Sequence, residues 1–348
     1  MKSLLKDIRK LSTEEITADF SLQNIPKYRA KQVSEWLWNK SAGSFDEMTN
    51  LSKEFRQWMS ENYQIQQISE SLIQQSNDGT IKIGFKCADN RMIEGVMIPA
   101  EDRMTACVSS QVGCSLACKF CATGMLKRER NLDAGEIYDQ VVFLNKQSIK
   151  QFNRPLSNIV YMGMGEPLLN YDNVMKSIDY ITSAEGLGMS PKRITVSTSG
   201  VSRGIRRLAD EGKKFKLALS LHAADDAKRE LIMDINKSNP LDDVMDALKY
   251  FYDKTGNKIT FEYILFHQFN DSDEDAKNLI LLCKKVPAFV NIIEYNQVEG
   301  VIYTKSSEER LNYFKKILEK NGIDVQVRRS RGKDIDAACG QLANKNQA

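Results

Sequence analysis

The segment "CSLACKFC", residues 114–121, places three cysteines at C-x3-C-x2-C spacing directly after the strand-like run "RMTACVSS" at 103–110. Three thiolates within eight residues can bind one inorganic centre, and Gly113 gives the loop the backbone freedom that this requires. The chain has no fourth cysteine at a ferredoxin spacing and no second cysteine pair for a structural zinc site. The pattern favours an iron-sulfur cluster that leaves one iron open for a small molecule, with zinc as the alternative.

Strand-like and helical stretches alternate from about residue 133 to residue 328. The apolar runs are "NIVYM", "RITVS", "FKLALSL", "KITFEYIL", "FVNIIEY" and "DVQVR". This alternation predicts parallel strands joined by crossover helices, in an open sheet or a full or partial barrel. Ligands of such folds bind at the carboxyl ends of the strands, which is where we expect the cysteine loop to lie.

The N-terminal part of the chain has a different pattern. Residues 1 to about 63 have helical apolar spacing and contain all three tryptophans, which predicts a small unit with its own core. The short strand-like runs "TIKIGFKC" and "RMIEGVMIP" follow. We therefore expect an accessory domain at 1–99, a core domain at 100–337 and a C-terminal segment at 338–348.

The composition is that of an ordinary globular protein, with 42% hydrophobic and 27% charged residues among 348. A formal net charge of +3 permits a nucleic-acid partner without requiring one. No signal peptide is apparent, and no apolar run approaches the roughly 18 residues that span a bilayer. We expect a cytoplasmic protein without a membrane partner. Its seven cysteines are unevenly spaced and odd in number, which favours metal binding or redox chemistry over a structural disulfide framework.

Polar groups recur where the expected strands end. Two glycines and a carboxylate follow the first run in "GMGEP", and hydroxyl, imidazole and amide groups follow the later runs. Singly, each is more typical of a turn or cap, and His222 fits a core position as well as a site. Together they predict a cofactor pocket formed by Gly165, Glu166, Ser197, Ser220, Leu221, His222 and Asn296.

Five stretches resemble one family over nearly the whole chain: "CVSSQVGCSLACKFCATG", "MGMGEPLLN", "RITVSTSG", "LALSLHA" and "RGKDIDAACGQL". They are similar to the bacterial dual-specificity adenine-C2 RNA methyltransferases of the radical S-adenosylmethionine (SAM) superfamily. The resemblance implies an α/β fold, a partial (βα)6 TIM-like radical SAM barrel with a helical accessory RNA-binding domain and a short β extension. It also implies a 4Fe-4S cluster on Cys114, Cys118 and Cys121, and two SAM molecules per turnover.

The resemblance further implies a reaction and roles for three residues. The enzyme would methylate C2 of an adenine in 23S rRNA and of the adenine 3′ to the anticodon (A37) in some tRNAs. Cys339 would carry the methyl group and form a transient protein–RNA adduct, Cys107 would resolve that adduct through a transient disulfide bond, and Glu94 would accept a proton. From the residues alone, Glu94 is expected as an exposed strand carboxylate and Cys107 as a buried strand thiol.

The remaining expectations concern partners and rival functions. The family implies an electron donor such as flavodoxin, and access of a large RNA favours a monomer. Four basic clusters, at 127–130, 203–207, 213–216 and 328–333, are candidates for phosphate contacts. The rivals are the related enzyme that methylates C8 of the same rRNA adenine, disfavoured by "SQVGC" and "GEPLLN", and a non-catalytic iron-sulfur or zinc RNA-binding module.

Overall fold

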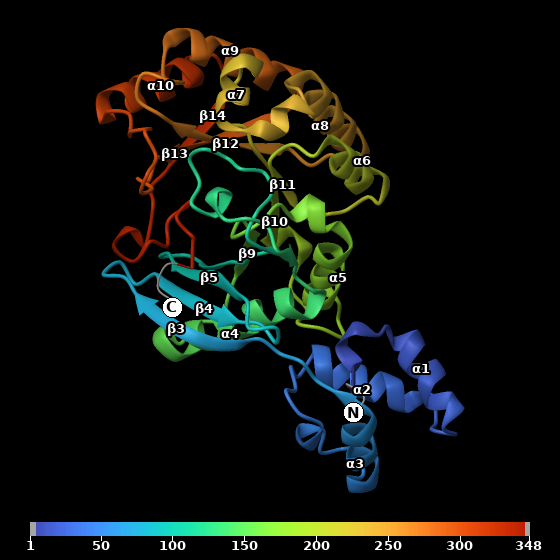
Figure 1. Cartoon of the computed structure of the whole chain (residues 1–348). Helices are drawn as coiled ribbons and strands as arrows, with labels where there is room; N and C mark the ends of the chain where they lie inside the picture. The colour runs from blue at the N-terminus through green and yellow to red at the C-terminus, as the bar shows by residue number, and fades with distance from the viewer. Residues whose placement is uncertain (1–4, 345–348) are drawn as a thin grey trace.

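A ten-stranded mixed sheet organises the computed structural model, which describes residues 5–344 (Figure 1). The strand order is β14-β13-β12-β11-β10-β9-β6-β5-β4-β3, and all pairings from β6 to β14 are parallel. The parallel strands are β6 (Met104–Cys107), β9 (Asn158–Tyr161), β10 (Ile194–Thr198), β11 (Lys216–Ser220), β12 (Ile259–Leu265), β13 (Ala288–Glu294) and β14 (Asp324–Arg328). Their near-continuous apolar runs suit strands covered on both faces.

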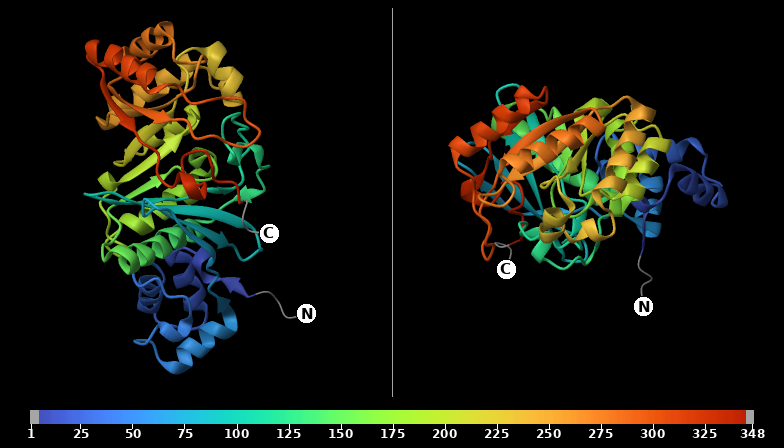
Figure 2. Two further views of the ribbon diagram at one scale, coloured as in Figure 1. Left: turned by 90° about the vertical axis from the view of Figure 1, so that its left-hand side faces the viewer. Right: turned by 90° about the horizontal axis from the view of Figure 1, so that it is seen from above.

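Helices follow each parallel strand except the last within the described residues. They are α4 (Ala134–Phe152), α5 (Tyr171–Thr182), α6 (Ser202–Asp210), α7 (Asp226–Ile232), α8 (Leu241–Thr255), α9 (Asp273–Lys285) and α10 (Glu308–Lys320). They form one layer outside the curved sheet, as the view from above shows (Figure 2). Strands β14 and β3 do not pair within 5–344, so the barrel stays open. The partial (βα)6 barrel is confirmed, with β14 as an additional parallel strand.

Local sequence explains where several helices begin and end. Helix α4 starts with a capping box formed by Asp133 and Glu136, and it ends at Asn153 in the left-handed conformation. Helix α9 starts with a second capping box, in which Ser272 and Asp275 exchange hydrogen bonds with each other's backbone N–H groups. These caps satisfy N–H groups that the first helical turn leaves without partners.

The N-terminal unit is helical, as expected, and is attached to the core by specific contacts (Figure 2). It comprises β1 (Lys6–Asp7), α1 (Thr13–Leu22), α2 (Tyr28–Trp38), α3 (Lys53–Asn62) and β2 (Tyr63–Gln64). Phe20 packs edge-on against Phe55 and Trp58 and forms its internal core. Trp38 instead stacks on Tyr180 of α5 with ring centroids 3.6 Å apart. Trp58 therefore packs inside the unit, whereas Trp38 joins the unit to the core domain.

Three antiparallel strands extend the core sheet beyond β6. They are β5 (Met92–Pro99), β4 (Ile81–Lys86) and β3 (Ser69–Gln75). One face of this β extension packs on α4, where Phe85 contacts Phe143. The C-terminal segment lies over the same strands, as the red trace beside the cyan ones shows (Figure 2). Within 5–344, no helix is long and apolar enough to cross a membrane.

Candidate active site

A cleft of about 850 Å³, counted out to its open mouth, lies at the carboxyl ends of the parallel strands. The cysteine loop forms one wall, the strand ends form the floor, and the C-terminal segment closes another side. Predicted residues that line it are Cys114, Cys118, Cys121, Gly165, Glu166, Ser197, Ser220, His222 and Cys339. The fold therefore brings together predicted residues from five separate segments of the chain.

The cysteine loop is folded by backbone positions that few residues tolerate. Gly113 has φ +71°, and a Cβ there would meet the carbonyl oxygen of Lys127 at 2.3 Å. The loop then returns through β8 (Arg130–Asn131), which pairs with β7 (Gln111–Val112). The close approach of Gly113 to Lys127, together with the β7–β8 pairing, closes the loop and holds the three thiols on the cleft wall.

The donor set fits a multi-iron cluster. Burial raises the pKa of Cys114 to about 11, while the backbone N–H groups of Leu116 and Ser115 oppose that rise. Such N–H contacts to sulfur are among the interactions that tune iron-sulfur clusters. Within the described residues, no three His, Cys, Asp or Glu side chains converge closely enough for a single metal ion. A structural zinc site takes four protein ligands and this loop offers three thiols, so the donor set suits a cluster better than structural zinc.

Polar groups at the ends of β9, β10 and β11 face the same cleft. The Ser197 and Ser220 hydroxyl oxygens lie 3.2 Å apart. The buried carboxylate of Glu166 accepts the backbone N–H groups of Ser199 at 2.7 Å and Leu168 at 3.1 Å. Glu166 therefore fixes the turn that carries Gly165, whose φ of +95° and close approach to Gln111 suit glycine.

Arg229 holds these strand ends from behind, although no sequence pattern singled it out. Its fully buried guanidinium donates to the carbonyls of Ser199 at 2.7 Å and Leu221 at 3.1 Å, and to the Asn236 side chain at 2.7 Å. Burial lowers the pKa of Arg229 to about 10, which still leaves it charged at neutral pH. A fixed positive charge thus lies beneath the cleft floor.

His222 is both buried and part of the cleft lining. Its Nδ1 accepts the backbone N–H of Ile264 at 3.1 Å, and its ring packs edge-on against Phe120 of the cysteine loop. Burial and the charge of Arg229 lower the pKa of His222 to about 3. The imidazole is therefore neutral at physiological pH and acts as a hydrogen-bond acceptor.

The C-terminal segment brings Cys339 to the cysteine loop. The Ala122 N–H donates to the Gly340 carbonyl at 2.7 Å, and the Thr123 hydroxyl donates to the Leu342 carbonyl at 2.6 Å. Cys339 lines the cleft, and residues 345–348 of the expected C-terminal segment lie outside the described residues.

Cys107, at the end of β6, does not line the cleft but lies within electrostatic range of Cys339. Burial and the Cys339 thiol raise the pKa of Cys107 to about 12. All seven cysteines are free thiols, so no disulfide joins these two here. Cys107 is partly buried rather than fully buried, and Cys283 is packed in the core as expected.

Three other predicted residues lie outside the cleft lining. Leu221 is buried and donates its N–H to the Glu262 carbonyl, and the Asn296 side chain donates to Ser330 at 2.9 Å. The expectation that Glu94 is exposed is wrong: it is 2% exposed, because the C-terminal segment covers its face of β5.

Ser199, Glu262 and Arg328 are among the lining residues that were not predicted as part of the site. Ser199 follows the strand end at Ser197, Glu262 interrupts the apolar run of β12, and Arg328 belongs to the last basic cluster. Glu262 has one carboxylate oxygen without a hydrogen bond, 3.8 Å from the Arg328 guanidinium. Cys339 raises the pKa of Arg328, with Glu262 and Cys107 adding to the effect, which makes Arg328 a neighbour of both thiols. A charged residue inside a buried strand was the available signal for Glu262.

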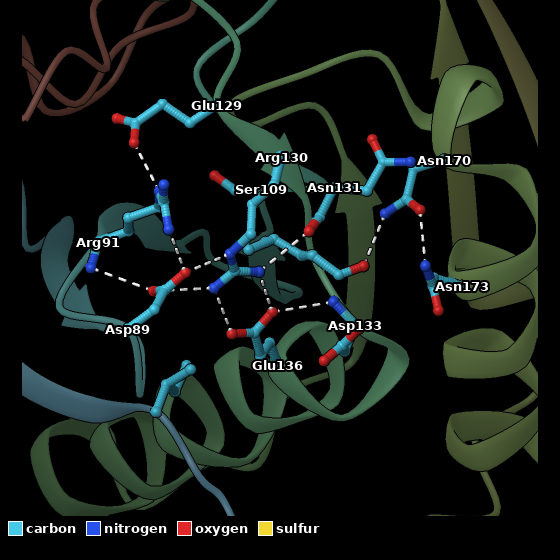
Figure 3. A network of polar contacts seen from close by, with 12 residues as sticks. Asp89, Arg91, Ser109, Glu129, Arg130, Asn131, Asp133, Glu136, Asn170 and Asn173 are labelled. Atoms are coloured by element: carbon cyan, nitrogen blue, oxygen red, sulfur yellow. Dashed lines mark hydrogen bonds and ion pairs between the residues drawn. The ribbon is translucent and has the colours of Figure 1, made fainter. Parts of the chain in front are cut away.

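Several residues of the basic clusters are neutralised internally. Arg130 lies between Asp89 and Glu136, and Arg91 joins Asp89 to Glu129 (Figure 3). In the last cluster, Arg329 and Lys333 both pair with Glu294. Arg130, Arg329 and Lys333 of the candidate clusters therefore already pair with carboxylates distant in sequence, and their role in phosphate contacts stays a prediction.

Two family models match the chain. The model described as the radical SAM superfamily matches residues 108–280. The model described as the ribosomal RNA large subunit methyltransferase N-terminal domain matches residues 6–65. The second match ends before the β extension and corresponds to the helical N-terminal unit.

Relatives and a solved structure cover nearly the whole chain. A probable dual-specificity RNA methyltransferase RlmN of Christiangramia forsetii is 55% identical, over 99% of this chain and 98% of its own. One of Thermotoga maritima with the same description is 42% identical, over 98% of each chain. The crystal structure of a radical SAM methyltransferase from Sphaerobacter thermophilus superposes with a TM-score of 0.91 at 39% identity, covering 97% of this chain and 99% of that one.

Proposed function

Because this chain belongs to the RlmN family of dual-specificity RNA methyltransferases in the radical SAM superfamily, we propose that it methylates C2 of adenine. The substrates would be 23S rRNA and the adenine 3′ to the anticodon (A37) in some tRNAs. The observation that carries this proposal is the presence of Cys339 in the same cleft as Cys114, Cys118 and Cys121. A thiol that only packed in the core would have no reason to face the cofactor site.

The family uses a 4Fe-4S cluster and SAM, which fit the cleft described above. When bound, they supply one-electron chemistry strong enough to remove hydrogen from an unactivated C–H bond, which polar side chains cannot do. The three loop cysteines would hold the cluster, and the strand-end groups would orient SAM. Arg229 would keep those strand ends fixed.

Cys339 would act as the methyl carrier. Its sulfur would take a methyl group from one SAM. After the one-electron chemistry supplied with the second SAM removes one hydrogen from that S-methyl group, the carbon would bond to C2 of the adenine, giving a protein–RNA adduct. Cys107 would then attack the Cys339 sulfur, which breaks the carbon–sulfur bond and leaves a transient disulfide that a reductant must open. Glu94 would accept the C2 proton. The neighbourhood of Cys107, Cys339 and Arg328 supports the first two roles.

The partners follow from the same proposal. The N-terminal helical unit would grip RNA, an electron donor such as flavodoxin would reduce the cluster, and the protein would work as a cytoplasmic monomer. An adenine must leave its stack to reach a cleft at the strand ends, so RNA contacts around the cleft mouth are expected. Exposed Lys127 and Arg128 of the cysteine loop are suitable for phosphate contacts.

The Cys107→Ala variant tests the resolving role. Without an attacking thiol, the adduct cannot be released, and a covalent RNA–protein species should accumulate under single-turnover conditions. Denaturing gel electrophoresis with labelled RNA measures the covalent species. Cys283→Ala is the control, because it removes a buried thiol outside the cleft and should not accumulate the adduct. Free methylated RNA at the wild-type rate from Cys107→Ala would refute the role.

The methyl position and the chemistry need separate measurements. RNA from a strain lacking this modification, treated with the reconstituted enzyme, should carry the methyl group at C2 when digested and analysed by mass spectrometry. A methyl group at C8 would favour the related resistance enzyme. A non-catalytic RNA-binding module predicts no 5′-deoxyadenosine from SAM even with an intact cluster and a reductant.

A further inference from the structure

The β extension has two buried faces, although only one of them packs on a helix. Residues 81–85 of β4 are all buried, whereas a strand with one covered face would alternate. The second face carries Lys82 and Glu94, which are 3% and 2% exposed. They are diagonal neighbours, because Lys82 pairs with Val96 and Gly84 pairs with Glu94, and their charged atoms lie 3.5 Å apart.

A buried lysine and glutamate are costly to desolvate and require an explanation. Such a pair gains little stability over apolar residues of similar size, but removing one partner leaves an uncompensated charge. Polar contacts beyond the pair itself therefore indicate what the pair is for. Here those contacts lead to the C-terminal segment.

The ion pair contacts the C-terminal segment on both sides of Cys339. One Glu94 carboxylate oxygen accepts the backbone N–H groups of Ala343 at 2.9 Å and Asn344 at 3.2 Å. The Lys82 ammonium donates to the Asp336 carbonyl at 3.4 Å. Since Ala122 and Thr123 hold Gly340 and Leu342 from the other side, the segment lies between the cysteine loop and the β extension.

We propose that Lys82 and Glu94 are positioning residues, whose buried ion pair docks residues 336–344 on the β extension and thereby sets the place of the Cys339 thiol in the cleft. This inference rests on the proposed role of Cys339 as methyl carrier. It also adds a condition to the role of Glu94, because its carboxylate is occupied by Lys82 and two N–H groups. Glu94 must release the segment before it can accept a proton from RNA.

The proposal predicts an effect before RNA takes part. Methyl transfer from SAM to sulfur needs close alignment, and a displacement of about 1 Å can cost on the order of 10²-fold in rate. If Glu94 served only as the proton acceptor for C2, neither Lys82 nor Glu94 would affect methylation of Cys339 itself. That half-reaction therefore separates the two roles.

The experiment measures how fast Cys339 gains a methyl group in the absence of RNA. Enzyme isolated without its cluster is reconstituted anaerobically with iron and sulfide and given SAM, and the peptide containing Cys339 is followed by mass spectrometry. Lys82→Met should slow the reaction roughly 10- to 100-fold, with iron content and the KM for SAM within about twofold of the wild type. Lys82→Arg, which keeps the charge and the donors, should recover much of the rate.

Controls distinguish positioning from folding. Lys86→Met makes the same substitution at an exposed position of the same strand and should behave as the wild type. The double variant Lys82→Met/Glu94→Met removes the buried charges together and should fold stably, yet it still lacks acceptors for Ala343 and Asn344. Its amide hydrogen exchange at 336–344 should remain faster than in the wild type.

Two results would contradict the proposal in different ways. A wild-type rate of Cys339 methylation in both Lys82→Met and Glu94→Gln, with unchanged exchange at 336–344, would overturn the positioning role. If the wild type itself never methylates Cys339, the proposed function fails instead. In that case, hydrogen exchange of the variants still reports whether the ion pair docks the segment.

Discussion

The two sides of the cleft are built in opposite ways. The cluster side is local: its three cysteines lie on one short loop, and the adjoining polar groups come from successive strands of one parallel sheet. The other side, called the carrier side after the role proposed for Cys339, is assembled from distant parts. Cys339 near the C-terminus interacts electrostatically with Cys107 on β6, and its segment is held by β4 and β5.

This difference teaches where each side is sensitive. On the cluster side, a single loop or one buried guanidinium controls several groups at once, so substitutions should have large and global effects. On the carrier side, hydrogen bonds hold a short segment whose removal leaves the sheet intact. Substitutions there, outside the buried Lys82–Glu94 pair, should loosen the segment and leave the global fold nearly unchanged.

The largest expected effect is the loss of the cluster itself. Cys118→Ala leaves two loop thiolates, which cannot retain a cluster that family members bind through three. The iron content after reconstitution should be at background, and no 5′-deoxyadenosine should form from SAM. Cys283→Ala, which removes a thiol from the core, should retain its iron. Iron retention by Cys118→Ala would show that the local side is not organised as described.

The second largest effect is expected for Arg229→Met, because this substitution removes a hydrogen-bond donor that the ends of two strands share. The carbonyls of Ser199 and Leu221 and the Asn236 side chain would lose a buried partner, at a cost of about 3–5 kcal/mol in the free energy of unfolding. Urea denaturation measures this, with Arg203→Met at an exposed position of α6 as the control. A loss below about 1 kcal/mol would contradict the role of Arg229.

His222 should make the cluster side sensitive to acid. Its pKa is lowered to about 3 from 6.5, so the unfolded chain binds a proton below pH 6.5 while the folded protein does not. Stability is thus full above pH 6.5 and is lost as the pH falls, by roughly 3 kcal/mol by pH 4.

His222→Gln, which keeps an acceptor for the Ile264 N–H but does not titrate, should remove that part of the pH dependence. Denaturation curves from pH 7 to 4 compare it with the wild type and with His267→Gln, whose side chain is half exposed. An unchanged slope in His222→Gln would show that the imidazole titrates normally in the folded state.

The smallest global effect is expected on the carrier side. Asp78, in the turn between β3 and β4, accepts the Gly332 N–H at 2.9 Å, at the start of the segment that leads to Cys339. Asp78→Ala should lower global stability by no more than about 1 kcal/mol, while amide exchange near residues 332–338 accelerates several-fold. Asp102→Ala, at an exposed position, is the matched control. Equal exchange in both variants would mean that this contact does not restrain the segment.

The sequence predicted the barrel, the helical N-terminal unit, and the cysteines and several strand-end polar groups of the cleft lining. It could do so because apolar runs reveal parallel strands, and because polar groups after such strands meet at one edge. It failed for the exposure of Glu94, and it did not reveal the carboxylate partners of Arg130 and Arg329, because these surroundings come from segments far away in the chain. It also could not identify Arg229, which looks like an ordinary charged residue of a short helix.

The cysteine spacing by itself determined that this protein can hold a cluster, because the three thiols are joined by one short loop whose reach is set by covalent geometry. Tertiary structure alone decided that Cys339 faces that loop and that Cys107 and Arg328 lie beside it. It also decided that Lys82 and Glu94 face the C-terminal segment. The reason is that these contacts join segments distant in the sequence. They depend on the register of β4, β5 and β6 and on the path of the chain after β14, which no local pattern specifies.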